Sequence, residues 1–185
     1  MSTEIYQLKI TALGIKPSIW RTILIPANAT FLDLHDVIML LFGFEDVHLF
    51  AFSDNGGYAD QIGDGSDGTK SATKVKLFQK FTDIDKMNYT YDFGDDWNFS
   101  IVLQKTLPLT KDAIYPQCIK WKGGMMLEDC GSYYGYEMIT NWCRNKTKKN
   151  ANVLIDYYGD DEILETYADF NPDKFDVNSI TLKQL

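Results

Sequence analysis

The stretch NYTYDFGDDWNFSIVLQ, residues 88–104, carries the clearest structural signal in this chain of 185 residues. Large apolar side chains alternate with polar ones on both sides of a short centre, which is the period of a strand with one buried face. The centre, Gly94-Asp95-Asp96, consists of residue types that form tight turns. The alternating side chains are Tyr89, Tyr91 and Phe93 before the turn and Trp97, Phe99, Ile101 and Leu103 after it. We therefore expect an aromatic β-hairpin here.

A second hairpin is predicted at the start of the chain. Residues 4–13 and 18–25 are rich in β-forming side chains, and turn residues at 14–17 separate them. A short apolar and aromatic segment at 47–52 predicts a third, buried strand.

A helix is expected between the second and third of these strands. Thr30 is followed three residues later by Asp33, a weaker form of the capping box that starts helices, and Gly43 is of the type that ends them. Between these signals, apolar residues repeat at helical spacing at Leu34, Val37, Ile38 and Leu41.

Outside these hairpins and the first helix, the sequence patterns are weaker. Residues 54–73 are rich in Gly and Asp and predict a mobile surface loop, while 75–81 is of uncertain type. The other expectations are a loop at 105–124, helices at 133–143 and 150–158, and an acidic end from 160 with Pro172 opening a last helical turn.

We expect one α+β domain over 1–185, with a mixed or antiparallel sheet, a β-hairpin–helix–strand (β-grasp-like) start, a second aromatic hairpin and short C-terminal helices.

Composition narrows the classes of protein that fit this sequence. The formal net charge of −8 disfavours nucleic-acid binding, without excluding a local basic patch. No apolar run is long enough to span a membrane. The opening MSTEIYQLKI lacks the pattern of a signal peptide, and the three cysteines are an odd number, so we expect a cytoplasmic protein with reduced thiols.

Several phrases, taken together and in order, resemble the plasmid ORF-three-like family, named after an open reading frame of a root-inducing (Ri) plasmid. The resemblance covers nearly the whole chain, and its phrases are YQLKITALGIKPSIWR, FLDLHDVIMLLFGFEDVHLFAF, YTYDFGDDWNFSIVL, YPQCI, EDCGSYYGYE and FNPDKFDVNSI. The family implies little chemistry, because its members are largely uncharacterised, although some are described as resembling a resolvase-type gene of an insertion element. No serine-recombinase active-site phrase is found in this chain.

This chain departs from the family pattern at two places. Phe50 stands where a second histidine often follows His48-Leu49. Met125-Met126-Leu127 replaces the usual Cys and Pro-Pro before Glu128-Asp129-Cys130.

The candidate binding surface is the turn of the aromatic hairpin. Asp92, Asp95 and Asp96 place three carboxylates there, which suits a divalent cation or the basic side chains of a partner, and Trp97 adds an aromatic ring. The alternative is turn chemistry alone, since Asp and Gly favour the backbone conformations of tight turns.

Four other residues are candidates for ligand or partner binding. Arg21 either binds an anionic ligand or pairs with a carboxylate of its own sheet, such as a turn aspartate. His48 lies in an apolar segment, where a histidine is often partly buried and hydrogen-bonded. Tyr133 and Tyr136 either line a groove for a peptide or small apolar ligand or close one end of the core.

The cysteines do not show the paired spacing of a zinc site, and only His35 and His48 could complete a ligand set. Acidic neighbours raise the pKa of a thiol, which argues against Cys130 as a nucleophile and favours packing at a helix start. A basic run, Arg144, Lys146, Lys148 and Lys149, either touches phosphate or forms a solvated helix end.

No set of nucleophile and base stands out, so we expect no catalytic residue, cofactor or metal. The function expected from these observations is a non-catalytic binding or adaptor domain whose acidic aromatic surface binds an unidentified protein or small ligand. An accessory protein of a mobile DNA element and a metal-dependent hydrolase are the alternatives.

Overall fold

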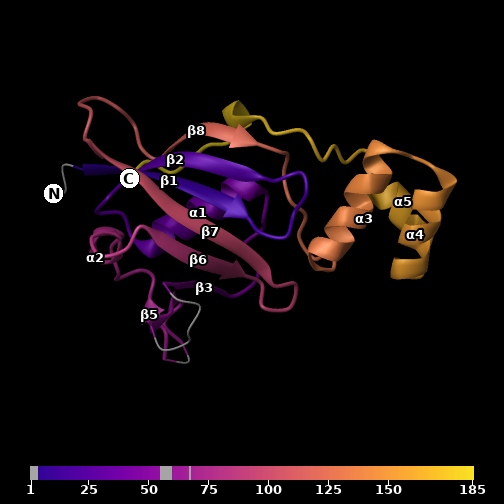
Figure 1. The fold of residues 1–185 in the computed structure, drawn as a ribbon, viewed down its shortest axis with the longest axis horizontal. Helices are drawn as coiled ribbons and strands as arrows, with labels where there is room; N and C mark the ends of the chain where they lie inside the picture. The colour runs from indigo at the N-terminus through magenta and orange to yellow at the C-terminus, as the bar shows by residue number, and fades with distance from the viewer. Residues whose placement is uncertain (1–3, 55–59, 67) are drawn as a thin grey trace.

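The computed structural model describes residues 4–54, 60–66 and 68–185, and its centre is a single eight-stranded sheet (Figure 1). The strand order is β5-β4-β3-β6-β7-β1-β2-β8, and neighbouring strands are antiparallel except for the parallel pair β4 and β5. The strands are β1 (Glu4–Ala12), β2 (Trp20–Pro26), β3 (Phe50–Ser53), β4 (Ile62–Gly63), β5 (Lys70–Ser71), β6 (Lys86–Tyr91), β7 (Trp97–Pro108) and β8 (Gln117–Lys122).

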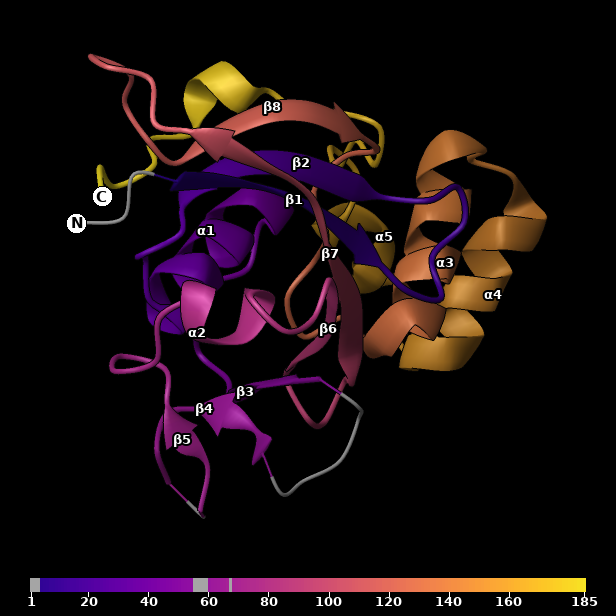
Figure 2. The same cartoon turned by 60° about the vertical axis from the view of Figure 1, so that its left-hand side comes forward.

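The first two helices along the chain lie against one face of the sheet, and the next three form a lobe beside one end of it (Figures 1 and 2). The last, a short 3-10 helix, lies beside β8. The bounds of the helices are α1 (Phe31–Phe42), α2 (Phe78–Phe81), α3 (Ser132–Arg144), α4 (Lys148–Tyr158), α5 (Glu162–Thr166) and the 3-10 helix η2 (Val177–Ser179). None of the helices in the described ranges is long and apolar enough to cross a lipid bilayer. The α+β architecture predicted from sequence is confirmed.

Helix α1 begins and ends where the sequence predicts. The hydroxyl of Thr30 accepts a hydrogen bond from the Asp33 amide (3.0 Å), and the Asp33 carboxylate accepts one from the Thr30 amide (2.7 Å), which completes a capping box. Gly43 ends the helix in the left-handed conformation, with φ of 91°. The predicted apolar stripe is buried against the sheet.

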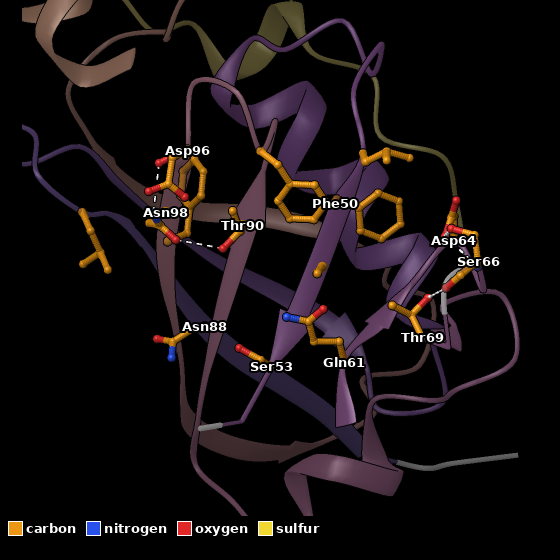
Figure 3. A pocket seen from close by; sticks show the side chains of 15 residues that line it. Phe50, Ser53, Gln61, Asp64, Ser66, Thr69, Asn88, Thr90, Asp96 and Asn98 are labelled. Atoms are coloured by element: carbon orange, nitrogen blue, oxygen red, sulfur yellow. Dashed lines mark hydrogen bonds between the residues drawn. The ribbon is translucent and has the colours of Figure 1, made fainter. Parts of the chain in front are cut away.

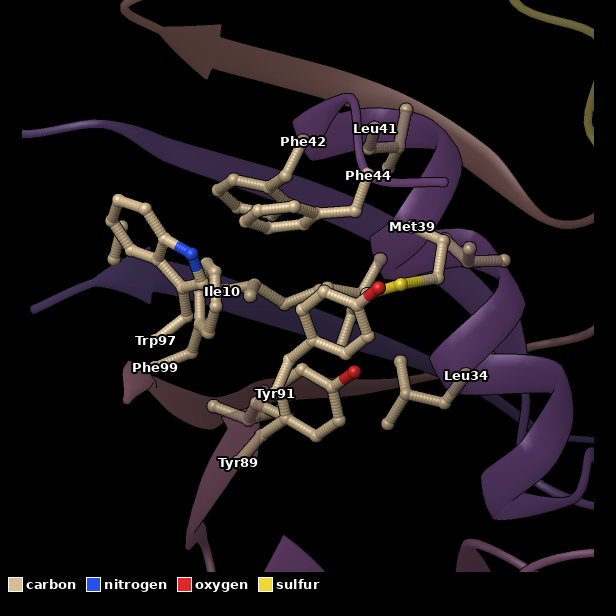
Figure 4. Packing of buried hydrophobic residues seen from close by; sticks show 14 of the residues in the cluster. Ile10, Leu34, Met39, Leu41, Phe42, Phe44, Tyr89, Tyr91, Trp97 and Phe99 are labelled. Atoms are coloured by element: carbon tan, nitrogen blue, oxygen red, sulfur yellow. The ribbon is translucent and has the colours of Figure 1, made fainter. Parts of the chain in front are cut away.

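The aromatic hairpin formed by β6 and β7 supplies much of the core. Tyr91 pairs directly with Trp97, and the register places every second side chain against α1. The rings of Phe42 and Phe99 meet edge to face at 4.9 Å, and Phe44 lies on Tyr91 at the same separation (Figure 4). The hairpin predicted from alternation is therefore the structural centre of the molecule.

The sequence interpretation missed an edge strand within 105–124. Strand β7 continues to Pro108 and β8 adds to the far side of β2, where Ile23 pairs with Cys118. Most of β8 is exposed, so it has no alternating buried face that a sequence pattern could reveal.

The remaining boundaries differ more modestly from expectation. The third strand starts at Phe50 rather than at 47, so His48 lies in a connection and not in a strand. The predicted loop 54–73 contains the short strands β4 and β5, while residues 55–59 and 67 lie outside the described residues. Near the C-terminus, the last helical turn is η2, several residues after Pro172.

Arg21 is a structural residue of the sheet. Its side chain is fully buried, and its guanidinium donates to the backbone carbonyl oxygens of Leu41 (3.0 Å), Lys122 (2.9 Å) and Gly124 (2.6 Å). The ring of Phe175 covers it at 3.8 Å, and burial lowers its pKa to about 10. Arg21 thus ties α1, β8 and the C-terminal segment together, and the expected ion pair with a turn aspartate does not form.

Candidate functional site

Three connections that are far apart in sequence bring four ligand-type side chains together. We call the side chains of His48, Asp92, Glu128 and Asp129 the His48 cluster. His48 precedes β3, Asp92 follows β6, and the two other acids belong to the segment that leads into α3. One nitrogen or oxygen atom from each of the four side chains lies within 4.8 Å of the corresponding atoms of the others.

The imidazole is at the centre of the cluster. Nε2 of His48 lies 2.9 Å from Oδ1 of Asp129, 3.6 Å from Oε1 of Glu128 and 3.7 Å from Oδ2 of Asp92. The ring edge also packs on Tyr91, at 5.9 Å between ring centres. One ring nitrogen therefore faces three carboxylates.

Backbone geometry holds Asp92 in place. The residue ends β6 in the left-handed conformation, with φ of 53°, which Asp tolerates better than most residues. Its amide donates to the carbonyl oxygen of Leu49 (2.9 Å), and its Oδ1 accepts from the Gly94 amide (2.9 Å). The side chain is only 9% exposed, and its second oxygen, Oδ2, faces His48. The hydrogen bond of the turn to Oδ1 thus holds the carboxylate so that Oδ2 points toward His48.

Glu128 closes the cluster from the opposite segment. Its Oε2 accepts a hydrogen bond from the Glu45 amide (2.8 Å), and its side chain is 11% exposed. Oε1 is buried without a well-formed hydrogen bond in the described part of the chain, although the Tyr91 hydroxyl is near enough to lower the carboxyl pKa in part. Burial outweighs this and raises the pKa of Glu128 above its usual value.

The acids also change the protonation of His48. Desolvation opposes the charged imidazolium, but the hydrogen bond with Asp129 and the charges of Asp92 and Glu128 outweigh it and raise the pKa of His48 above 6.5. The carboxylates thus surround a site that favours positive charge. With neutral His48 the four side chains carry a formal charge of about −3, and with the imidazolium about −2.

Unsatisfied buried polar atoms concentrate at this corner of the molecule. Among the described side chains, the buried nitrogen and oxygen atoms without a hydrogen-bond partner are Asp95 Oδ2, Trp97 Nε1 and Glu128 Oε1. All three belong to the hairpin turn or to the segment that faces it. Such atoms are costly in a folded protein and commonly mark a functional region or an absent small partner.

His35 forms the other group of this kind, with Asp36 and Asp46. Its Nδ1 lies 2.7 Å from the Tyr89 hydroxyl and its Nε2 lies 2.7 Å from Oδ1 of Asp46. The ring is 1% exposed and stacks on Phe50 at 3.7 Å. Both ring nitrogens are therefore already hydrogen-bonded, and the group is a buried structural network.

The two groups differ in what they can do chemically. One imidazole nitrogen together with carboxylate oxygens is a common ligand set for divalent transition metals. The His48 cluster offers such a set, with an accessible histidine that is 31% exposed. In the His35 group the ring is 1% exposed, and both of its nitrogens are hydrogen-bonded, one of them to buried Tyr89.

The structure separates the residues of the predicted binding surface. His48 and Asp92 meet in the His48 cluster, whereas Asp95 and Asp96 lie outside it. Trp97 is 2% exposed and packs against the Tyr136 ring at 6.2 Å, so it belongs to the core. The exposed ring of the turn is instead Phe93, at 56%.

Tyr133 and Tyr136 lie in different surroundings. Tyr136 is buried, and its hydroxyl donates to the carbonyl oxygen of Met125 (3.0 Å). Tyr133 stacks on Tyr134, with 3.9 Å between ring centres, and its ring lies beside Gly14. Tyr136 thus closes one end of the core, which is the structural alternative that the sequence left open.

Cys130 is inert by environment. The thiol is fully buried, and burial, together with the charge of Asp95, raises its pKa to about 12. Its carbonyl oxygen accepts a hydrogen bond from the Tyr158 hydroxyl (2.6 Å) beside the start of α3. No cysteine of the described ranges belongs to a group of metal-ligand side chains.

Glu128 and Asp129 are the members of the cluster that the sequence interpretation missed as ligands. In the sequence they stand beside Cys130, and nothing in their spacing links them to Asp92, 36 positions before Glu128, or to His48, 80 positions before it. The available signal was the phrase EDCGSYYGYE, in which two acids precede a predicted helix. In the structure no side chain caps the start of this helix.

Comparisons with known proteins agree on the family and do not assign an activity. A family model described as plasmid pRiA4b ORF-3-like protein matches residues 4–179. The uncharacterized protein y4hQ of Sinorhizobium fredii is 26% identical over 176 residues, which are 92% of this chain and 89% of that protein. A crystal structure of the protein of unknown function MM3350 from Methanosarcina mazei Go1 has a TM-score of 0.80 and 34% identity, and the match covers 96% of this chain and 98% of that one.

Proposed function

The chain belongs to the plasmid pRiA4b ORF-3-like family, and from the geometry of its side chains we propose that it is a divalent-cation-binding domain whose ligands are the His48 cluster. The observation that carries the proposal is the convergence of one imidazole nitrogen and three carboxylates within 4.8 Å. In the described part of the chain, no lysine or arginine forms an ion pair with these acids.

Charge balance supports a cation at this place. Three carboxylates at such short separations repel one another, and burial of Glu128 increases the cost. Protonation of His48 offsets only one of the three charges. A dication bound by the cluster offsets two charges, and its coordination satisfies the buried Oε1 of Glu128.

The ligand types indicate which cation is preferred. Ca²⁺ and Mg²⁺ favour oxygen ligands alone, whereas imidazole suits Zn²⁺ and its first-row neighbours. Because the cluster mixes one nitrogen with several oxygens, we expect Zn²⁺ and Mn²⁺ to bind more tightly than Mg²⁺.

A binding or adaptor role is the biological setting that we assign to this cation site. The acid at its edge, Asp129, is 70% exposed, and the exposed ring of Phe93 follows Asp92 directly. An exposed aromatic ring beside acidic groups suits contact with a partner. The basic run gives little support to nucleic-acid binding, because Arg144 pairs with Asp173 at 2.8 Å and Lys146 donates to the Ala168 carbonyl oxygen at 2.9 Å.

The test is a calorimetric titration of chelator-treated protein with Zn²⁺, Mn²⁺ and Mg²⁺. We expect saturable Zn²⁺ and Mn²⁺ binding, and Asp129→Asn should weaken it about tenfold by removing one charged ligand.

Asp112→Asn is the matched control for this experiment. Asp112 is another exposed aspartate in the left-handed conformation, with φ of 69° against 48° for Asp129, and it lies outside the cluster. Absence of saturable binding by the wild-type protein, or equal affinities of wild type and Asp129→Asn, would reject the proposal.

A further inference from the structure

The second feature of interest is a pocket on the sheet face opposite α1. Its volume is about 690 Å³, within the range of roughly 300–1,000 Å³ of small-ligand sites. In Figure 1, α1 lies behind the sheet, and none of the helices in the described ranges covers β3 and β6 on the near side. We propose that this pocket binds a neutral carbohydrate, a use independent of the cation site.

The floor of the pocket consists of neutral polar residues on paired strands. Ser53 pairs with Asn88 across β3 and β6, and Thr90 pairs with Asn98 across β6 and β7. Because side chains alternate along a strand, these residues point away from the aromatic core. Gln61 directly precedes β4 and also lines the pocket, and Figure 3 shows its amide in a row with Ser53 and Asn88.

Several of these groups have unused hydrogen-bonding capacity. Thr90 and Asn98 bond each other at 2.8 Å, but the side chains of Ser53, Asn88 and Gln61 make no hydrogen bond within the described residues. Ser53 is only 8% exposed. The Ser53 hydroxyl is not among the described buried atoms that lack a partner, so it lies within reach of solvent, and a ligand that donates and accepts hydrogen bonds suits this floor.

The rim of the pocket is apolar. Leu13, Leu49 and Phe93 line it and are 45%, 55% and 56% exposed. An exposed aromatic ring beside a hydrogen-bonding floor matches a sugar ring, which has hydroxyl groups at its edge and a C–H face that packs on an aromatic side chain.

The charges of the lining exclude other ligand classes. Among the described residues that line the pocket there is no lysine, arginine or histidine, whereas Asp64 and Asp96 do line it, so a phosphate or carboxylate ligand would be repelled. Asp64 is engaged by Ser66, whose amide and hydroxyl donate to it at 2.8 and 2.7 Å. These hydrogen bonds stabilise the charged form of Asp64 and lower its pKa. Asp64 and exposed Asp96 lie outside the paired strands, whereas the floor itself is neutral, which suits a neutral ligand there.

The proposal is tested by NMR on ¹⁵N-labelled, chelator-treated protein, so that a failure of the cation site does not affect the result. The probes are glucose, galactose, mannose, N-acetylglucosamine, maltose and cellobiose, with spermidine and inorganic phosphate as charged comparisons. We expect at least one neutral sugar to shift the side-chain amide signals of Asn88, Asn98 and Gln61. The proposal is overturned if none of the sugars shifts these signals, or if spermidine or phosphate does so instead.

Two variants and two matched controls assign the binding to this pocket. Asn88→Ala and Phe93→Ala should each weaken binding of the sugar about tenfold, the change that follows loss of one hydrogen bond or one ring contact. Gln104→Ala removes an amide from β7 outside the pocket, and Phe78→Ala removes an exposed ring from α2, so both should bind as the wild type does. Equal binding by wild type, Asn88→Ala and Phe93→Ala contradicts the assignment.

Discussion

His35 and His48, the two histidines of the chain, both lie among carboxylates but in opposite conditions. The ring of His35 is buried, and its two nitrogens bond Tyr89 and Asp46. The ring of His48 is partly exposed and turns one nitrogen toward three acids. The difference shows that proximity of histidine and acids does not by itself make a ligand site. What matters is the accessibility of the ring: His35 is 1% exposed and bonded at both nitrogens, whereas His48 is 31% exposed and its bond with Asp129 joins two members of the same cluster.

Removing His35 should produce the largest effect. His35→Ala deletes a buried ring stacked on Phe50 and leaves the Tyr89 hydroxyl without its partner, so the free energy of unfolding should fall by about 3 kcal/mol. Urea denaturation measures the change, and calorimetry should find Zn²⁺ affinity within about twofold of wild type in the folded variant. A large loss of Zn²⁺ affinity in His35→Ala, with little loss of stability, would contradict the structural role of His35 and indicate that it is a metal ligand.

Removing His48 should give the converse result. His48→Ala takes away the nitrogen ligand, and we expect Zn²⁺ affinity to fall about 100-fold, or about 2.7 kcal/mol. The free energy of unfolding without metal should change little, because the ion pairs of His48 are partly exposed and screened by solvent. Unchanged Zn²⁺ affinity in this variant contradicts the account.

A smaller effect should come from the buried acid of the cluster. Glu128→Gln keeps the shape of the side chain and removes its charge, so Zn²⁺ affinity should fall about tenfold. The metal-free variant should be at least as stable as wild type, because burial raises the pKa of Glu128 and so disfavours its ionised form. Thermal denaturation checks this, with exposed Glu137→Gln as the control. A clear loss of metal-free stability would mean that the carboxylate is structural.

The smallest effect is the response of the two rings to pH in metal-free protein. Burial lowers the pKa of His35 below 6.5, while the surrounding carboxylates outweigh desolvation and raise the pKa of His48 above it. NMR signals of the two imidazoles, followed against pH, should therefore change in separate ranges, with His48 titrating at the higher pH. Titration of the two rings at the same pH would contradict the difference in environment described for His35 and His48.

The pKa shifts of His35 and His48 make the folding stability depend on pH in opposite directions. For His35 the unfolded chain takes up its proton first, so the stability due to the neutral ring is present above 6.5 and is lost as pH falls from there through the lowered pKa. For His48 the folded protein takes up its proton first. Its contribution is present below 6.5 and is lost as pH rises through the raised pKa.

The sequence was informative where local patterns fix the structure. Alternation predicted the aromatic hairpin, and the Thr30–Asp33 pair with Gly43 predicted the ends of α1. Strand β8 was missed because an exposed edge strand has no period-two pattern to detect.

The site was predicted only in part, because it is a long-range property of the fold. Asp92 and His48 were selected from their local surroundings, but their meeting with Glu128 depends on the register of three connections. Conversely, Trp97 was selected as a surface ring and is buried, because the alternation of β7 begins at this residue.

The most direct test of the central claim follows from the chain having two histidines. In ¹⁵N NMR spectra of the imidazole rings, each histidine gives its own set of signals, and chelator-treated protein can be titrated with Zn²⁺. Our account predicts that Zn²⁺ shifts the ring nitrogen signals of His48 and leaves those of His35 unchanged. A spectrum in which His48 does not respond, or in which His35 responds first, would contradict the assignment of the His48 cluster as the cation site.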